Sequence, residues 1–298
     1  MPAFTTQTGV EIYYETNGDP SDRPLVLVHG SGAQLIGWDD EFVAQLVDAG
    51  FYVVRPDNRD VGLSQMTAER RDLTATYDLS DMAEDVVALL DELGIARAHL
   101  AGMSMGGYII QLVAISHPDR VASLALMSTS ASSAPEFLAS APGDGKPVEK
   151  VPRLFGRAAY IAMFVAGQRQ LASPGFAFDA KESAALGARY YKRSFRPDGV
   201  ARQWNALLRG PLERREALGA VTAPAIVIHG LQDPVLLPYA AATLAEILPA
   251  AELQLYPEMG HDVPRELWPD FVRAFVRVAD RAAAADAVDG GEDDPSHA

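Results

Sequence analysis

The chain has 298 residues, of which 48% are hydrophobic and 22% charged, and its formal net charge at pH 7 is −15. This length and composition are ordinary for a globular protein with a substantial core. The negative charge argues against a nucleic-acid partner, whose phosphates it would repel. The absence of cysteine excludes disulfides, thiolate metal ligands and a cysteine nucleophile.

The first residues, MPAFTTQTGVEIYY, contain neither the basic stretch nor the apolar stretch of a secretory signal. No apolar run approaches ~20 residues, the length that crosses a bilayer. The sequence therefore predicts a cytoplasmic protein without a membrane span. Nothing in the sequence indicates an oligomeric state.

Short apolar runs alternate with amphipathic stretches along most of the chain. A helix is predicted over 79–95, with Ser80 as its expected N-cap, and further helices over 106–120 and 267–282. The predicted strands are, in chain order, 10–17, 24–30, 51–57, 98–102, 121–128, 223–230 and 251–257. Such alternation is typical of the α/β class, with a mostly parallel sheet covered by helices on both faces.

This alternation stops between about residues 131 and 220. Residues 135–219 hold 14 Lys and Arg against 8 Asp and Glu, whereas the remainder holds 11 against 32. We therefore predict a core formed by 1–130 and 220–282 and an inserted helical cap at 131–219. The acidic end, 283–298, is predicted to be a disordered tail.

A serine between glycines follows one of the predicted strands. The segment from Gly102 to Gly106 reads GMSMG and fits the pattern G-x-S-x-G, with a strand before it and a helix after it. That pattern makes a strained turn that lifts a serine hydroxyl clear of the sheet, and the glycines remove collisions with neighbouring backbone. Ser104 is the candidate nucleophile, and the alternative is an ordinary glycine-rich turn with a bystander serine.

A serine nucleophile needs a base, and an acid to orient that base. His261 lies in a loop between the last predicted strand and the last helix, where catalytic groups of open α/β sheets gather. Asp233 lies just after a buried strand and between the other two in sequence, so the order is Ser, Asp, His. Glu258 and Asp262 are nearer to the histidine in sequence, but such close neighbours seldom have the geometry to orient it.

An oxyanion hole needs two backbone donors. One is the N–H of Met105, which follows the serine, and the other is expected from the glycine-rich segment HGSG after an early strand. We assign the second donor to the N–H of Ser31, with Gly32 beside it. His29 is interpreted as a residue that shapes this loop, and no phosphate-binding glycine motif is present.

Taken together, these residues resemble the α/β-hydrolase superfamily over about residues 3–280. Four segments agree in order: HGSG, GMSMGG, GLQDPV and GHDVP. The segments RPDNRDVGLS and LIGWDDEFVAQL are similar to the esterase branch that includes aclacinomycin methylesterase, which removes a methyl ester from an anthracycline polyketide. The resemblance implies the same roles for Ser104, Asp233, His261, Ser31 and Met105. In NRDVGLS we expect a structural loop in which Asp57 pairs with Arg59.

These features predict a serine carboxylic ester hydrolase that needs no metal or organic cofactor. Its partner would be a small, hydrophobic ester, and the positive cap either attracts anionic substrates or docks on the acidic core. Gly32 and Trp38, near the oxyanion loop, are candidates for the substrate pocket, with Tyr160, Phe164 and Trp204 from the cap. The alternative for any one cap aromatic is a packing role. The further cap aromatics are Phe137, Phe155, Phe178, Tyr190 and Tyr191.

Other readings remain open at this point. C–C bond hydrolysis, amide or aminopeptide cleavage and cofactor-free perhydrolysis would use the same three residues, because they differ in the pocket. A non-catalytic ligand receptor on the same scaffold is a further alternative, although such receptors often lack a member of the triad. The choice of ester depends on the cap and cannot be predicted from these motifs.

Overall fold

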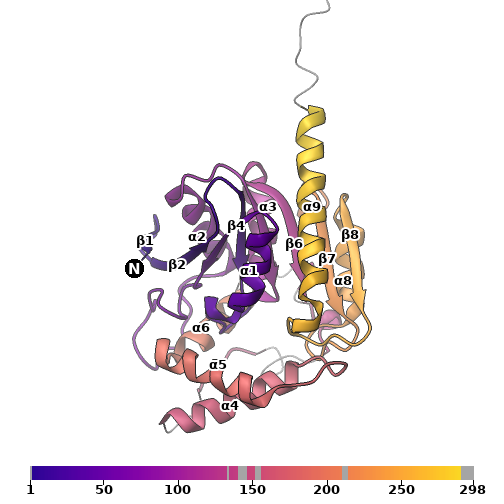
Figure 1. Cartoon of the computed structure of the whole chain (residues 1–298). Coiled ribbons are helices and arrows are strands. Elements are labelled where there is room, and N and C mark those ends of the chain that lie inside the picture. The colour runs from indigo at the N-terminus through magenta and orange to yellow at the C-terminus, as the bar shows by residue number, and fades with distance from the viewer. Residues whose placement is uncertain (1, 133, 140–145, 152–155, 210–213, 290–298) are drawn as a thin grey trace, which may run out of the picture.

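The computed structural model describes residues 2–132, 134–139, 146–151, 156–209 and 214–289 (Figure 1). Its strands form one sheet in the order β1-β2-β4-β3-β5-β6-β7-β8. From β4 to β8 the neighbouring strands are parallel, and β1 and β2 join antiparallel at one edge. The strands are β1 Ala3–Thr5, β2 Glu11–Asn17, β3 Arg23–Val28, β4 Phe51–Pro56, β5 Ala98–Met103, β6 Val121–Met127, β7 Ala225–Gly230 and β8 Ala251–Tyr256.

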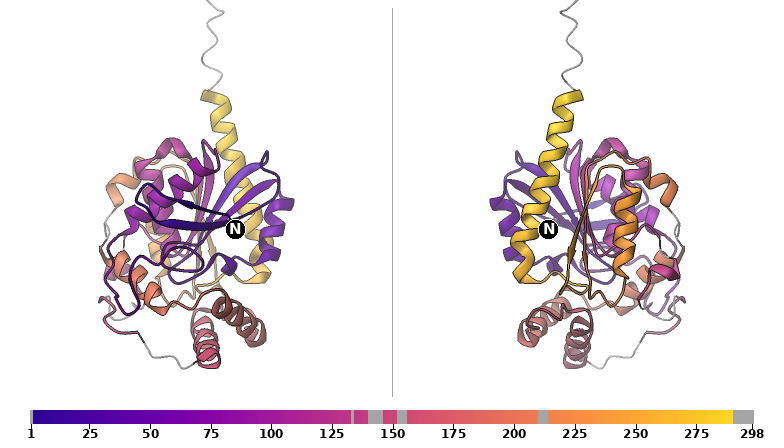
Figure 2. Two further views of the ribbon diagram at one scale, coloured as in Figure 1. Left: turned by 90° about the vertical axis from the view of Figure 1, so that its left-hand side faces the viewer. Right: turned by 90° about the vertical axis from the view of Figure 1, so that its right-hand side faces the viewer.

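Helices cover both faces of this sheet, which Figure 2 shows in two side views. Successive strand residues point to opposite faces. In β3, Leu25 and Leu27 therefore pack against α1 and α9, whereas Val26 and Val28 pack in the core shared with α2, α3 and α8. The predicted α/β class is thus confirmed. These helices are α1 Asp40–Asp48, α2 Leu79–Glu92, α3 Met105–Ser116, α8 Pro238–Ile247 and α9 Trp268–Asp289.

Three long helices lie between β6 and β7 in the chain and gather at one end of the sheet (Figure 1). They are α4 Gly156–Leu171, α5 Ala180–Arg193 and α6 Pro197–Arg209. These helices lie at the carboxyl ends of the parallel strands, because Gln203 of α6 contacts the loop after β3 and Ser173, which follows α4, contacts the loop after β8. The short helices are η1 Leu35–Gly37, η2 Pro118–Arg120, η3 Pro135–Phe137, α7 Arg215–Leu218 and η5 Arg265–Leu267.

Two boundaries differ from the prediction. The N-cap of α2 is Asp78 and not Ser80, because the Asp78 carboxylate accepts from the Ser80 N–H and forms a capping box with Asp81. At the other end of the chain, α9 continues to Asp289, so the predicted disordered tail is helical over 283–289. The run of alanines after Arg281 explains this, because alanine has the highest helix propensity. Within the described part of the chain, we find no helix that is long and apolar enough to cross a membrane.

Candidate active site

Ser104 occupies a sharp turn between β5 and α3. Its φ of 54° and ψ of −119° lie outside the regions that non-glycine residues favour, so the turn is strained. The glycines around it permit this turn: a Cβ on Gly102 would lie 2.5 Å from the Gly106 carbonyl oxygen, and a Cβ on Gly106 would overlap the Val28 carbonyl. Ser104 is partly exposed at the carboxyl end of β5, as the motif predicts.

The helix that follows the turn packs tightly on the next strand. A Cβ on Gly107 would lie 2.6 Å from the Thr129 side chain, which follows β6. The Thr129 hydroxyl donates to the Ser104 carbonyl oxygen at 3.0 Å and so ties the turn to its neighbour. Gly107 therefore allows the close approach of α3 and the sheet.

Asp233 and His261 form a buried pair. Asp233 follows β7, and its Oδ2 lies 2.7 Å from Nδ1 of His261, which follows β8. The other oxygen, Oδ1, accepts from the N–H groups of Val235 at 2.8 Å and Leu236 at 2.9 Å. The carboxylate is therefore fixed at both oxygens, and it holds the imidazole with Nδ1 as donor and Nε2 directed elsewhere.

A second histidine contacts the same carboxylate, and sequence reasoning passed over it. His229, the penultimate residue of β7, is fully buried, with Nε2 3.5 Å from Asp233 Oδ2 and 3.2 Å from the Leu236 carbonyl oxygen. Burial lowers the pKa of His229, which favours a neutral ring that donates from Nε2. The sequence does contain a signal for this contact, because His229 lies at the end of a predicted strand and only four residues before Asp233.

The structure distinguishes Asp233 from the two other acids near His261 in sequence, Glu258 and Asp262. Asp262 accepts from the hydroxyl and the N–H of Ser173, in the connection between α4 and α5, and makes no hydrogen bond to the His261 ring. Burial raises the pKa of Asp262. The Glu258 side chain packs beside Gly175, in the same connection. Both acids therefore hold the cap segment, and Asp233 alone of the three bonds the imidazole.

Ser104 lies at the same sheet edge as this pair, because β5, β6, β7 and β8 are consecutive parallel strands. No hydrogen bond joins the Ser104 hydroxyl to the imidazole of His261 among the contacts of these two described residues. The structure thus brings Asp233 and His261 into direct contact and sets the serine on the strand two positions away from β7.

The loop after β3 lies against the serine. A Cβ on Gly30 would lie 3.2 Å from the Ser104 Cβ, a tight contact that glycine avoids. The Gly30 N–H turns toward His29 Nδ1 at 2.8 Å, and the Gly32 N–H donates to Gln203 Oε1 of α6 at 2.8 Å. The N–H groups of Ser31 and Met105 make no hydrogen bond to any described residue, which leaves both available to a ligand.

His29 and Trp38 shape the other side of this loop. Burial lowers the pKa of His29 to about 4, and its ring lies 4.8 Å from the indole of Trp38. Trp38 is 1% exposed and stacks on Phe42, in the core under α1 and α9. This placement supports the interpretation of His29 as a loop-shaping residue. Trp38 lies behind the oxyanion loop, and its role in the pocket stays a prediction.

The candidate pocket residues of the cap separate into two groups. Tyr160 and Phe164 of α4 form an aromatic cluster with Tyr190 of α5. The ring centroid of Phe164 lies 6.1 Å from that of Tyr160 and 5.0 Å from that of Tyr190. Burial raises the pKa of Tyr160 to about 12. Trp204 of α6 packs instead against the core beside α2, and its indole N–H donates to the Lys146 carbonyl at 3.1 Å. Phe155 lies outside the described residues.

The expected pairing of Asp57 with Arg59 is wrong. Arg59 makes a buried bidentate bond to Asp85 of α2 at 2.6 and 2.7 Å. Asp57 is fully buried, pairs with Arg193 of α5 at 2.6 Å and accepts from the Leu35 N–H at 2.8 Å. The two side chains leave the segment on opposite sides, so each reaches a different helix.

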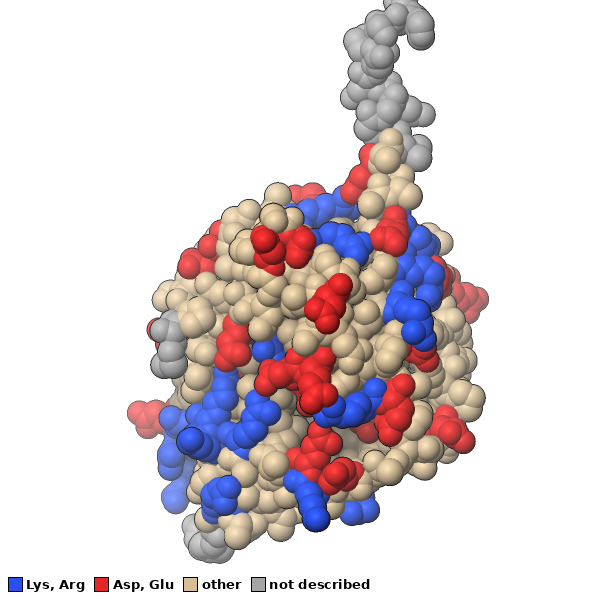
Figure 3. All heavy atoms as spheres, viewed as in Figure 1, with Lys and Arg blue, Asp and Glu red and all other residues tan. Residues whose placement is uncertain are grey.

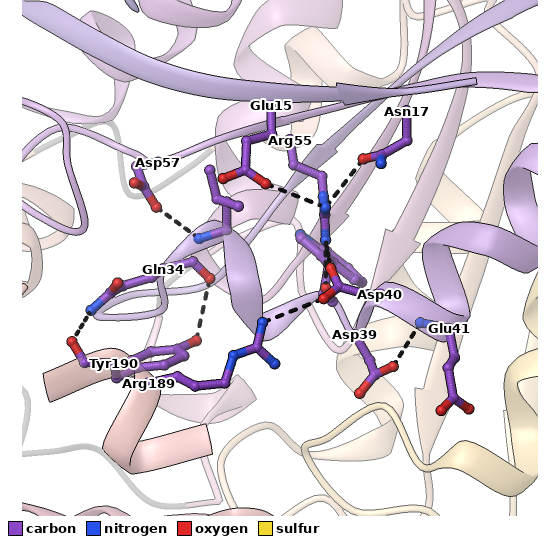
Figure 4. A network of polar contacts seen from close by, with 12 residues as sticks. Glu15, Asn17, Gln34, Asp39, Asp40, Glu41, Arg55, Asp57, Arg189 and Tyr190 are labelled. Atoms are coloured by element: carbon purple, nitrogen blue, oxygen red, sulfur yellow. Dashed lines mark hydrogen bonds and ion pairs between the residues drawn. The ribbon is translucent and has the colours of Figure 1, made fainter. Parts of the chain in front are cut away.

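Asp57 belongs to a network that ties α5 to the loop after β3. Figure 4 shows Asp57 and Tyr190 on either side of the segment that carries Gln34. The Gln34 amide donates to the Tyr190 and Ser194 carbonyls at 3.1 Å, and the Tyr190 hydroxyl donates to the Gln34 carbonyl at 3.2 Å. The end of α5 is therefore hydrogen-bonded directly to the loop beside Ser104. Among the described residues, no cluster of three or more His, Asp or Glu side chains is arranged to hold a metal ion.

Comparisons with known proteins find hydrolases that match most of the chain. The chain is 30% identical over 291 residues to rhodomycin D methylesterase DauP of Streptomyces sp. (strain C5), covering 89% of this chain and 93% of that one. It is 29% identical over 273 residues to 2-hydroxymuconate semialdehyde hydrolase of Pseudomonas sp. (strain CF600), covering 87% and 89%. The solved structure of the enol-lactonase from Burkholderia xenovorans LB400 superposes with a TM-score of 0.74 at 24% identity, covering 93% and 99%.

The match to a family model is equally broad. The model of the α/β hydrolase fold matches residues 23–266, which run from the first parallel strand past the candidate base. The resemblance drawn from the four motif segments is thereby confirmed, together with the expectation of a hydrolytic enzyme. The chain belongs to the α/β hydrolase fold family.

Proposed function

We propose that this protein is a serine carboxylic ester hydrolase that forms an acyl-enzyme on Ser104. The observation that carries the proposal is the buried Asp233–His261 pair at the sheet edge where Ser104 stands in its strained turn. A nucleophile, a base and a group that orients the base are the components that acyl transfer requires. The methylesterase names of two relatives agree with ester chemistry.

In the proposed reaction, Nε2 of His261 accepts the Ser104 proton as the hydroxyl attacks the ester carbonyl. Asp233 stabilises the imidazolium that forms, and general base assistance of this kind contributes ~10²–10⁴-fold. The alcohol leaves with the proton from His261, and water activated by the same ring then releases the acid. The Ser104 hydroxyl and the imidazole are not hydrogen-bonded in this structure, and such catalytic contacts often tighten only when the substrate binds.

The N–H groups of Ser31 and Met105 are the proposed oxyanion donors. Met105 is the first residue of α3, so its N–H belongs to the unsatisfied, positive end of the helix. The neighbouring Gly32 N–H is already bonded to Gln203, which fixes the loop in place. Each such donor is worth ~3 kcal/mol of transition-state stabilisation.

We propose that α4, α5 and α6 form the cap over this site and select the substrate. Tyr160 and Phe164 offer apolar surface, which suits a methyl ester or another hydrophobic small ester. The rhodomycin D methylesterase relatives point to a polycyclic aromatic acid as the portion that the cap would hold. C–C bond hydrolysis, amide cleavage and perhydrolysis would use the same triad. Assays with different substrates therefore distinguish these reactions from ester hydrolysis, whereas mutation of the triad does not.

The test is turnover of p-nitrophenyl esters of increasing acyl length and of methyl esters of polycyclic aromatic acids. Ser104→Ala should abolish the burst and the turnover, while Ser116→Ala, at the far end of the same helix, should not. His261→Ala should lower kcat at least ~10³-fold, whereas His117→Ala, at a surface ion pair with Glu84, should not. Wild-type enzyme that turns over no ester, or full activity in Ser104→Ala, would refute the proposal.

A further inference from the structure

A second hollow lies outside the candidate active site. It has a volume of about 660 Å³ and lies between the loop after β4 and the junction of α5 with α6. Its lining contains four basic residues, Arg70, Lys192, Arg193 and Arg196, and no Asp or Glu among the described residues that form it. None of the three proposed catalytic side chains lines it. This open hollow therefore gathers four cations and no anion in a chain whose net charge is −15.

The cations of this hollow are largely without counter-charges. Arg70, Lys192 and Arg196 are exposed and form no ion pair with any described acid. Arg193 is mostly buried, and its Nη1 contacts Asp57 Oδ2 at 2.6 Å. Its guanidinium is stacked over the Tyr13 ring, 5.0 Å from the ring centroid, and its Nη2 is buried. Like charges held close together repel each other, so the three exposed cations without an ion-pair partner favour a bound anion.

We propose that this hollow binds a small molecule that carries a multivalent phosphate group. Guanidinium groups match phosphate geometry with paired donors, and the exposed Arg70 and Arg196 supply such groups to the hollow. The volume falls within the range of ordinary small-molecule pockets. Phe195 and Tyr191 also line the hollow and provide apolar surface for the organic part of such a molecule.

A small ligand fits the surroundings better than an extended polyanion does. Figure 3 shows Lys and Arg side chains gathered over the region of α5 and α6, with Asp and Glu side chains elsewhere on the same face. A nucleic acid or an anionic membrane would extend beyond the basic group onto that acidic surface and be repelled. A molecule held in the hollow would contact basic and uncharged side chains and no acidic one among the described residues.

This site touches the active-site scaffold without sharing its reacting groups. Arg193 Nη1 also donates to Gln34 Oε1 at 3.1 Å, and Asp57 accepts from the Leu35 N–H at 2.8 Å. The hollow therefore lies behind the oxyanion loop, on the far side of Gln34. Binding there requires neither Ser104 nor an ester, so the inference does not depend on the proposed reaction.

The experiment is calorimetric titration of the full chain with inorganic pyrophosphate at fixed ionic strength, with chloride as the balancing anion. We expect one saturable site, with affinity weakened about tenfold in Lys192→Gln and again in Arg196→Gln, because each loses a charge-assisted bond. Lys181→Gln is the matched control: it removes an exposed charge at the opposite end of α5, ~18 Å away along the helix. Ser104→Ala should bind as the wild type does.

Three results would overturn the inference. One is the absence of saturable heat at millimolar pyrophosphate. Another is an equal loss of affinity in Lys181→Gln and Arg196→Gln, which would mean nonspecific charge attraction. The third is loss of binding in Ser104→Ala together with competitive inhibition of ester turnover, which would place the anion in the active site.

Discussion

A buried ion pair between Asp60 and Arg202 links α6 to the loop after β4. Arg202 donates to both carboxylate oxygens, from Nη2 at 2.7 Å and from Nε at 3.0 Å, and the two side chains are 0% and 2% exposed. Asp60 also accepts from the Thr67 N–H and hydroxyl and from the Tyr77 hydroxyl, at 2.7–2.8 Å. We therefore choose Arg202→Met as the perturbation.

The magnitude follows from what remains after the change. Removing one partner of a buried pair costs ~3–5 kcal/mol, because the other charge stays buried without compensation. Here the donors from Thr67 and Tyr77 stay in place, so we expect the lower end, about 3 kcal/mol. Asp60→Asn should cost a similar amount, and asparagine tolerates the φ of 73° at this position. The double variant should cost ~2 kcal/mol less than the sum, since it leaves no buried charge.

Urea denaturation followed by circular dichroism measures all four members of this cycle. The wild type is compared with Arg202→Met, Asp60→Asn and the double variant, and Arg209→Met, an exposed residue at the end of the same helix, should change stability by less than ~0.5 kcal/mol. Ester turnover should also fall in Arg202→Met, because the next residue, Gln203, holds the Gly32 N–H. Additive costs in the cycle, or an unchanged Arg202→Met, would refute the reasoning.

Three further predictions concern other parts of the molecule. Burial lowers the pKa of His99 from 6.5 to about 4, so between these pH values the unfolded chain binds a proton that the folded chain does not bind. The free energy of unfolding should therefore fall as the pH drops from 6.5 toward 4, by up to ~3 kcal/mol. Urea denaturation at several pH values measures this dependence, and His99→Gln should remove this part of it. Ser173→Ala removes the hydroxyl that joins the connection between α4 and α5 to the loop of His261. We expect kcat to fall about tenfold with KM nearly unchanged, and the acid limb of the pH profile of kcat to shift. An unaltered pH profile would limit Ser173 to a structural role. Gly106→Ala introduces a Cβ that overlaps a backbone carbonyl of β3, so it should lower the free energy of unfolding by ~3 kcal/mol or more, as measured by thermal unfolding. Gly167→Ala is the control: its Cβ would have nothing within 4 Å, and it should stabilise α4 by ~0.5–1 kcal/mol. Equal effects of the two variants would contradict the steric argument.

The fold was accessible from sequence because its signals are local. Apolar runs such as that of β3 and the glycine pattern around Ser104 are read within ten residues, and both depend on short-range geometry. The α2 N-cap was misplaced because Asp78 and Ser80 are both good caps, and the choice between them depends on which side chain reaches the free N–H groups. The order of the strands in the sheet, by contrast, depends on contacts far apart in the chain.

The partners of charged residues were not accessible for the same reason. Asp57 and Arg59 stand two apart and invite a local pairing, yet their partners lie on α5 and α2, at residues 193 and 85. A segment with several alternating charges has many possible partners of nearly equal Coulomb energy. The choice among them is made by burial, which sequence alone does not show.

The cap contacts the active-site loops on two sides, which bears on how substrate choice and catalysis are linked. Gln203 of α6 holds the Gly32 N–H beside the oxyanion loop, and the Leu171 carbonyl accepts from the His261 N–H at 2.8 Å. Both bonds end on backbone groups within two residues of proposed catalytic atoms. A substrate that shifts α4 or α6 must therefore also move Ser31 or His261. Variants that break either bond would then lower kcat, whereas residues that only line the pocket would change KM alone.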